Sequence, residues 1–473
     1  MKTFNHNQML SKLYVHVDIG GGETMLAGQL IVDRARRTGA FKYAREYCRH
    51  PEAYALDPIN LPLVDGAVYE SPITRDNLGI AGALLDAGPD DWGRRVLIAL
   101  LDPPPSNDLE FLLAGSGNGT GTIFFTETRV KDDDSAVLNQ FLPEEFQEED
   151  INEIPTKTFP KEFQSLEDIM ETALRLDEGL PVDKEKAMFF EYGSGLGGVR
   201  PKTFIDDVQY DEELGRKRVS RWIVKFPRKT DLVDHCLLEH STMQMAREAG
   251  CDVAETRIMD TARGPLLLVK RFDLDADGER CHMISARSLI GPIPENAASM
   301  TELSSYPNIG KVIEQVSENP DKDVKDLFRR MLLNIAVGNV DDHLNNHAFR
   351  KPPGKKTLQL TPAYDVLPTV GIEGSPQSIS VGPFGGHQNP KAIAFCAESM
   401  GIEEDEAAEM ARDVLGATKD WQEKYEKAGL SQKEISIIGK SMTSRDHLVR
   451  YLESLSVQDR EREVKTKGIS MSR

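Results

Sequence analysis

The sequence predicts an α+β chain in which β-rich segments precede a large helical part. Apolar and polar residues alternate within 13–33 and 219–226, which indicates strands, because successive strand side chains point to opposite faces. Further on, apolar residues recur three and four positions apart, most clearly in 325–337 and 400–442, which indicates helices. An acidic stretch with several prolines, 131–165, marks a domain boundary between differently composed regions.

Composition is typical of a soluble globular protein with roughly two to four domains. The 473 residues are 39% hydrophobic and 28% charged, and no apolar run is long enough to cross a membrane. The five cysteines are scattered and the N-terminus lacks the apolar core of a signal peptide, so we expect reduced thiols and a cytoplasmic location. A net charge of −20 opposes direct binding to DNA phosphates, so we expect any nucleic acid to be contacted through a partner.

The N-terminal part, residues 1–130, is predicted to be a mixed β-rich domain. Residues 13–33 indicate a hairpin with a turn at Gly20-Gly21-Gly22. The run from Asp18 to Glu23 can also be compared with the phosphate loop of actin-like sugar kinases, because glycine lets a backbone approach phosphate. No companion loop of that family follows, so the hairpin is favoured. Residues 89–95 are predicted to open a helix.

A glycine-rich loop opens the next region, which begins at residue 166. Four of the six residues 193–198 are glycine, so several backbone N–H groups can point toward phosphate oxygens, and two basic residues follow. Glycine loops are common, so this pattern alone is a weak signal. The candidate phosphate contacts are Gly195, Leu196, Gly197, Gly198, Val199, Arg200 and Lys202.

A lysine and a glutamate downstream suggest a pair that orders nucleotide phosphates. Alternation in 219–226 places Trp222 and Phe226 on one strand face and Lys225 on the other. The helix predicted for 234–249 carries Glu239. A strand lysine paired with a helix glutamate orders ATP phosphates in kinases. The alternatives are an edge lysine that reaches water and an ordinary surface glutamate.

The apolar strand 266–269 runs directly into Lys270, Arg271, Phe272 and Asp273. In kinases, a strand that continues into a linker is where backbone groups bind adenine, with an acidic residue near the ribose. We therefore expect a nucleotide hinge at 270–273.

The polar cluster 338–347 follows a helix that Gly338 is expected to end. Asp341 lies five residues before Asn346, and after one more hairpin comes Asp365. A base, an Asn five residues on and a metal-binding Asp after the next strand form the pattern of a kinase site, and oxygen ligands suit Mg²⁺. The alternative is a solvated Asp/Asn/His turn. Spacing cannot rank Asp341 against its neighbour Asp342 as the base.

These six parts occur in the chain order of a protein kinase: glycine loop, strand lysine, helix glutamate, hinge, catalytic loop and metal aspartate. We therefore predict a two-lobed protein-kinase-like fold that follows the N-terminal domain and the acidic linker 131–165. The small β-rich lobe is expected at 166–275 and the large helical lobe at 276–473.

The chain resembles the HipA family of serine/threonine kinases, the toxins of bacterial toxin–antitoxin pairs. The matching stretches are GLGGVRPK (195–202), WIVKFP (222–227), LLLVKRFD (266–273), GNVDDHLNNHAF (338–349) and LTPAYDVLP (360–368). The resemblance implies that Asp341 accepts the proton of the substrate hydroxyl and that Asn346 and Asp365 hold Mg²⁺. His343 would help build the loop around the phosphates, and Tyr364 belongs to the second motif.

The same resemblance implies ATP as phosphate donor, with Lys225 at the phosphates, the backbone of 270–272 at adenine and Asp273 near the ribose. It also implies a small helix-turn-helix antitoxin of HipB type that contacts DNA, and a substrate in translation such as an aminoacyl-tRNA synthetase. Two positions depart from the family pattern. Gly195 replaces a serine that is phosphorylated in the family, with Ser194 one residue earlier, and Asn345 replaces a basic residue.

Two other functions remain compatible with this sequence. One is a kinase-like ATP-binding protein without transfer activity, favoured only by the two departures. The other is a small-molecule phosphotransferase on the same scaffold.

Overall fold

The computed structural model describes residues 10–73, 79–127, 166–191, 198–211, 216–275, 278–293, 297–371 and 374–456. Within these ranges the chain forms two compact units. The first takes its residues from Met1–Asp231, Glu255–Pro292 and Ala348–Thr361, and the second from Leu232–Ala254, Ile293–His347 and Pro362–Arg473.

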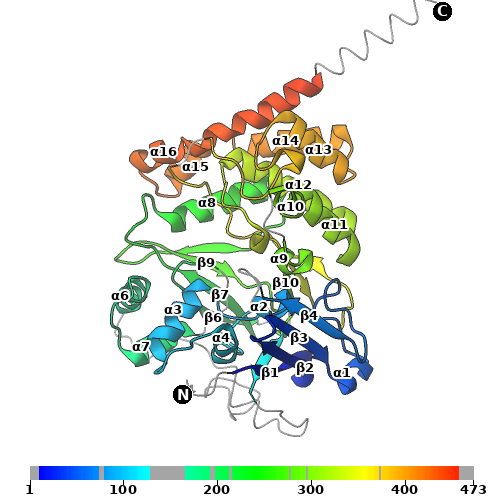
Figure 1. Cartoon of the computed structure of the whole chain (residues 1–473). Helices are drawn as coiled ribbons and strands as arrows, with labels where there is room; N and C mark the ends of the chain where they lie inside the picture. Colours follow the sequence, from blue (N-terminus) through cyan, green and yellow to red (C-terminus); the bar gives the residue numbers. More distant parts are fainter. Residues whose placement is uncertain are drawn as a thin grey trace, which may run out of the picture. The chain divides into compact units, whose positions relative to one another are not determined.

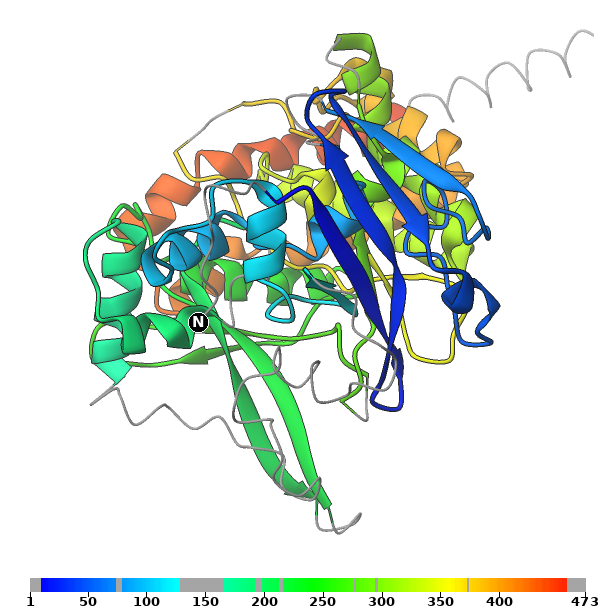
Figure 2. The same cartoon turned by 60° about the horizontal axis from the view of Figure 1, so that its bottom comes forward.

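The first unit begins with a five-stranded antiparallel sheet in the order β4-β3-β2-β1-β5 (Figure 2). Its strands are β1 (Lys12–Gly20), β2 (Glu23–Asp33), β3 (Thr38–Tyr43), β4 (Val68–Pro72) and β5 (Ile123–Thr126). The predicted hairpin is confirmed, since β1 pairs with β2 up to Gly20 opposite Glu23. Gly21 and Gly22 close it with φ of 64° and 76°, a conformation that favours glycine.

Four helices lie between the strands of this sheet in sequence: α1 (Arg45–Arg49), α2 (Gly82–Asp86), α3 (Asp91–Leu100) and α4 (Asp108–Ala114). The helix predicted to open at 89–95 is confirmed as α3. Asp90 is its N-cap, and the Asp90 side chain accepts a hydrogen bond from the Gly93 backbone N–H at 2.6 Å.

A second sheet of the first unit has the order β6-β7-β9-β8, with all neighbours antiparallel. Its strands are β6 (Lys202–Asp211), β7 (Arg216–Lys225), β8 (Thr256–Met259) and β9 (Leu266–Lys270). Helices α3, α6 (Leu166–Asp177) and α7 (Lys184–Glu191) share one hydrophobic core with it (Figure 1). Trp222, Val224 and Phe226 enter this core, which confirms the predicted alternation along β7.

A third, small sheet completes the first unit. Its strands are β10 (His282–Ser285), β11 (Ala348–Lys351) and β12 (Gln359–Leu360), and α9 (Ala286–Ile290) follows β10.

The second unit is helical, and α12 (Pro320–Val337) is its central element. This helix packs against α8 (His235–Glu248), α11 (Tyr306–Val316), α13 (Pro390–Ser399) and α14 (Glu404–Ala417). The remaining helices are α10 (Ala297–Leu303), α15 (Trp421–Lys427) and α16 (Gln432–Ile438). Among the helices in the described ranges, none combines the length and the apolarity that a bilayer crossing requires.

The units divide the chain differently from the predicted domain boundaries. The N-terminal region and most of the predicted small lobe fall in one unit, because α3 shares its core with the β6–β9 sheet. Helix α8, expected in the small lobe, belongs to the helical unit, whereas 348–361 join the first unit. The acidic linker 131–165 lies outside the described residues.

Candidate active site

The loop that carries the predicted base starts where α12 ends. Gly338 adopts the left-handed conformation with φ of 68° and allows the chain to leave the helix sharply. A Cβ atom at this position would collide with the Ser441 carbonyl, so the space as well as the backbone requires glycine.

Asp342 is buried in this loop and has a structural role. Its Oδ2 accepts hydrogen bonds from the Tyr306 hydroxyl at 2.5 Å, from Asn334 Nδ2 at 2.9 Å and from His347 Nε2 at 2.9 Å. Burial by itself would raise the pKa of Asp342, but His347 and the other donors outweigh it and hold that pKa below its ordinary value. A carboxylate already used by three buried donors is poorly placed to take a proton from a substrate.

Asp341 has the opposite environment, because its side chain is exposed while its backbone is fixed. The backbone N–H groups of Val340 and Asp341 donate to Thr369 Oγ1 at 3.0 and 3.3 Å. The Val340 carbonyl accepts from the Ser378 hydroxyl at 2.8 Å and from the Ser378 N–H at 2.9 Å. The geometry therefore favours Asp341 over Asp342 as the base, a choice that sequence spacing leaves open.

The second motif lies beside this loop. The Tyr364 hydroxyl donates to the Asn345 carbonyl at 2.6 Å, so the residues preceding Asp365 and Asn346 are in direct contact. Asp365 has φ of 58°, a left-handed conformation that is uncommon outside glycine. His343 is exposed, and its carbonyl accepts from the Asn346 N–H at 2.8 Å.

This donor set is suited to magnesium. Asn346 and Asp365 offer oxygen atoms, the ligands that this hard cation prefers. The described residues contain no cluster of three or more His, Cys, Asp or Glu side chains that could enclose a metal ion. Two protein ligands are nevertheless enough, since Mg²⁺ usually keeps several waters and binds substrate phosphates.

The predicted phosphate contacts of the first unit differ in exposure and in their partners. Lys225 is half-buried at the end of β7, directly opposite Lys202 in the β6–β7 register. The Lys202 ammonium group is buried and lies 2.9 Å from Asp90 Oδ2. Arg200 forms a bidentate ion pair with Asp231, with bonds of 2.6 and 2.9 Å. Gly198 and Val199 are exposed, and the predicted contacts Gly195, Leu196 and Gly197 lie outside the described residues.

The structure thus gives two of these residues partners within the protein. Lys202 and Arg200 neutralise carboxylates of the protein, so neither is a free phosphate ligand here. In the second unit, Glu239 is buried on α8.

The hinge residues are also engaged within the protein. Lys270 is exposed and pairs with Glu255 at 3.2 Å. Arg271 and Asp273 form a buried ion pair with bonds of 2.9 and 2.6 Å, and the Phe272 carbonyl accepts from Arg350 at 2.9 Å. Burial would raise the pKa of Asp273, but the Arg271 guanidinium, Arg280 and the Gly121 N–H together outweigh it and lower that pKa. In contrast to the expected ribose contact, the Asp273 carboxylate is enclosed, and a sugar would reach it only if this pair opened.

Comparison with known proteins relates part of the chain to a known domain family. Residues 194–422 match the family described as HipA-like C-terminal domain. This part of the chain is therefore similar to the C-terminal domain of HipA proteins. Its fold matches a chain of the solved complex of HipA, HipB and operator DNA from Shewanella oneidensis over 93% of this chain and 97% of that chain. The TM-score is 0.55 and the sequence identity 18%, which shows a shared fold.

Two relatives match the chain in part. The Y4dM protein of Sinorhizobium fredii is 30% identical over 168 residues, which are 32% of this chain and 39% of that protein. The serine/threonine-protein kinase toxin HipA of Shewanella oneidensis is 26% identical over 204 residues, 39% of this chain and 46% of that protein. The chain therefore spans less than half the length of each.

Several supporting residues were not predicted from the sequence. Tyr306 and Asn334 hold Asp342, while Thr369 and Ser378 hold the backbone before Asp341. Asn334 had a usable signal, since it is a polar residue within the apolar run of α12. The other three lie far away in the sequence and had none.

Proposed function

We propose that this chain is an ATP- and Mg²⁺-dependent serine/threonine protein kinase of the HipA family. The observation that carries the proposal is the contrast between two adjacent carboxylates. The buried Asp342 carboxylate accepts three hydrogen bonds within the protein, whereas the Asp341 side chain is exposed to solvent on a backbone fixed by Thr369 and Ser378. A general base needs this combination of a free side chain and a fixed position.

In the proposed reaction, the Asp341 carboxylate orients a serine or threonine hydroxyl and receives its proton. The hydroxyl oxygen forms a bond to the γ-phosphorus of ATP as the bond from that phosphorus to the leaving oxygen of ADP breaks. Asn346 and Asp365 would hold Mg²⁺, which supplies positive charge to the phosphates when bound. Lys225 would contact the phosphates, as the family resemblance implies.

The proposal extends to partners and substrate. The Shewanella relative is named a kinase toxin, and its solved complex contains HipB and operator DNA. We infer a HipB-type antitoxin as partner here, with DNA contacted through it, because a net charge of −20 opposes direct contact with DNA phosphates. The substrate class is a cytoplasmic component of translation, for which an aminoacyl-tRNA synthetase is the first candidate.

The test is transfer of labelled phosphate from ATP·Mg²⁺, followed by intact mass and peptide mapping. Asp341→Asn is expected to lower transfer by about 10²- to 10⁴-fold, since it removes the base. Asp413→Asn, an exposed carboxylate on α14, is the matched control and is expected to retain full transfer. Full labelling in Asp341→Asn would contradict the assignment of the base.

The same assay separates the two alternative functions. Label in added small alcohols but not in protein would indicate a small-molecule phosphotransferase. Tight ATP binding with no transfer to either would indicate a binding protein without transfer activity.

A further inference from the structure

The segment 199–202, which directly follows the predicted phosphate-binding glycines, is attached to the rest of the first unit at every residue. The Val199 carbonyl accepts from Arg228 Nη2 at 2.8 Å, and the Arg200 side chain pairs with Asp231. The Pro201 carbonyl accepts from the Phe226 N–H at 3.0 Å. At Lys202, the carbonyl accepts from Trp92 Nε1 at 2.8 Å and the ammonium group pairs with Asp90 at 2.9 Å.

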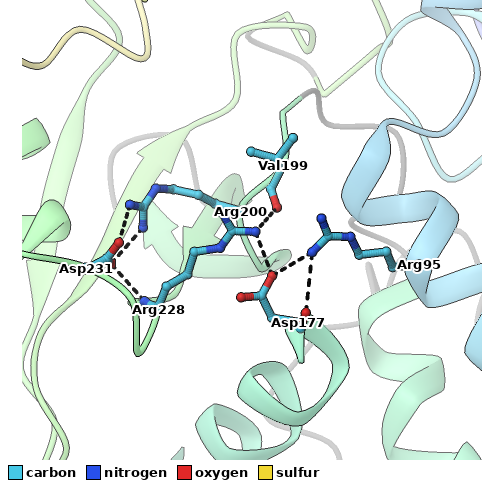
Figure 3. Close-up of polar contacts among 6 residues, drawn as sticks. All are labelled: Arg95, Asp177, Val199, Arg200, Arg228 and Asp231. Carbon is cyan, nitrogen blue, oxygen red and sulfur yellow. Dashed lines mark hydrogen bonds and ion pairs between the residues drawn. The ribbon is translucent and has the colours of Figure 1, made fainter. Parts of the chain in front are cut away.

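Besides the pair of Lys202 with Asp90, two carboxylates and three arginines take part in this attachment (Figure 3). Asp231 accepts both bonds of the Arg200 guanidinium and, at 2.9 Å, the backbone N–H of Arg228. Asp177 accepts from Arg228 Nη2 at 2.7 Å and from Arg95 Nη1 at 3.0 Å. Arg228 therefore connects the two carboxylates, because its backbone N–H donates to Asp231 and its Nη2 donates to Asp177. The same Nη2 also donates to the Val199 carbonyl.

The position of Asp177 explains why two arginines gather there. It is the last residue of α6, where the helix dipole is negative and a carboxylate is unfavourable without cations. Arg95 contacts both the Asp177 carboxylate and, at 3.5 Å, its main-chain carbonyl. Because Arg95 lies on α3, a helix of the N-terminal region is connected through Asp177 and Arg228 to the end of the glycine-rich segment.

Burial makes these pairs stronger than ordinary surface pairs. The side chains of Arg200 and Asp231 are 21% and 11% exposed, and those of Arg228 and Asp177 are 19% and 14% exposed. Solvent screening is reduced at this exposure, and bidentate arginine–carboxylate geometry adds directional specificity. The neighbouring ion pair of Lys229 with Glu178 is more exposed, at 58% and 35%. It is not among the bonds described above that hold residues 199–202.

We infer that Asp231 and Asp177 are positioning residues for nucleotide binding. They fix the end of the glycine-rich segment, and α3 supports them from the N-terminal region. The inference rests on the proposed kinase function and gives the N-terminal region a role in it. Arg200 acts in this arrangement as an anchor of the segment and not as a phosphate ligand.

The test uses the full-length protein and steady-state kinetics with ATP as the varied substrate. Asp231→Asn keeps an oxygen that can accept the Arg228 N–H but removes the charge facing Arg200. It is expected to raise the KM for ATP about tenfold, which corresponds to about 1.4 kcal/mol, while kcat stays within about twofold. Arg200→Gln removes the other charge of the same pair and is expected to raise the KM by a similar factor, and the double variant Arg200→Gln/Asp231→Asn is expected to show no larger loss than either single variant.

Glu178→Gln is the matched control, since it neutralises the carboxylate adjacent to Asp177, and its KM is expected to be unchanged. Arg95→Gln is expected to raise the KM in the same direction by about two- to threefold, because it acts only through Asp177. Thermal unfolding midpoints separate positioning from general destabilisation, which would lower the midpoint without a selective change in KM.

The failures are distinguishable. Normal wild-type turnover with an unchanged KM in Asp231→Asn overturns this inference alone. Additive losses in the double variant Arg200→Gln/Asp231→Asn also overturn it, because the two side chains would then not act through their ion pair. A wild-type protein that neither binds nor turns over ATP overturns the proposed function and this inference together.

Discussion

The segment 199–202 of the first unit and the loop 338–347 of the second are both held by side chains, but by bonds of different kinds. The first is fixed by hydrogen bonds to its carbonyls and by two ion pairs, of which Arg200 with Asp231 keeps some contact with water. The second is fixed around Asp342, whose buried carboxylate accepts three hydrogen bonds. The segment 199–202 is therefore expected to respond to charge and salt, while the loop 338–347 depends on packing and buried polar groups.

The largest effect is expected from Asp342→Ala, which leaves Tyr306, Asn334 and His347 without their shared acceptor. We expect the free energy of unfolding to fall by about 3–5 kcal/mol, the loss typical of breaking a buried charged network. Chemical denaturation followed by fluorescence measures it.

The neighbouring Asp341→Ala is the matched control for that experiment. Its side chain is exposed, so stability is expected to change by less than about 0.5 kcal/mol although phosphate transfer is lost. Equal losses of stability in the two variants would refute the distinction between a structural and a catalytic aspartate.

Acid should weaken the two units in different pH windows. Burial lowers the pKa of His282 in the first unit to about 4, below its value of about 6.5 in an unfolded chain. As pH falls, the unfolded state binds a proton at His282 before the folded state does. The free energy of unfolding therefore falls by up to about 3 kcal/mol between about pH 6.5 and about pH 4. The lowered pKa of Asp342 acts later, because its contribution is lost only as pH falls below the unfolded value of about 3.9.

Tryptophan fluorescence can separate these windows. Trp92 and Trp222 report on the first unit and Trp421 on the second, so Trp421→Phe restricts the signal to the first. His282→Gln is expected to flatten the pH dependence above pH 4 in that background. A loss of stability between pH 6.5 and 4 that is the same with and without His282 would exclude it as the cause.

A smaller effect is expected from Gly338→Ala at the start of the loop. The left-handed backbone and the collision with the Ser441 carbonyl together should cost about 2 kcal/mol of unfolding free energy. Gly401→Ala is the control, because Gly401 has a similar φ of 66° but open space around its Cβ position. If both variants lose the same stability, the contact with Ser441 contributes nothing.

The smallest effect concerns salt. Raising the ionic strength from about 0.1 M to about 1 M shortens the Debye length from about 10 Å to about 3 Å. In the wild type, this increase in salt should accelerate amide exchange in a peptide covering 198–202 by about two- to threefold more than in Asp231→Asn. Exchange in a peptide covering 338–347 should not respond. Equal responses would show that the two segments are held by the same kind of bond.

Local features of this chain could be predicted from its sequence. The β1–β2 hairpin, the start of α3, the end of α12 at Gly338 and the buried face of β7 follow from turn residues, caps and periodicity, and all are confirmed. They could be predicted because each depends on residues that are close in the chain.

Features that depend on distant residues could not be predicted. Nothing near Asp342 indicates that Tyr306 will donate to it, and nothing near Arg228 indicates a bond to Asp177, 51 positions earlier. For the same reason Lys202 was predicted to contact phosphate, although Asp90, 112 positions away, neutralises it. The domain boundaries differ because α3 shares a core with strands more than a hundred residues later.

The left-handed backbone at Asp365 limits which amino acids can replace it. Most side chains lose about 1–2 kcal/mol in this conformation, whereas asparagine and aspartate tolerate it. Asparagine is also nearly the same size as aspartate. The negative charge at this position can thus be removed without altering the bend of the chain, so an Asp365→Asn protein would isolate electrostatics from shape at the proposed magnesium site.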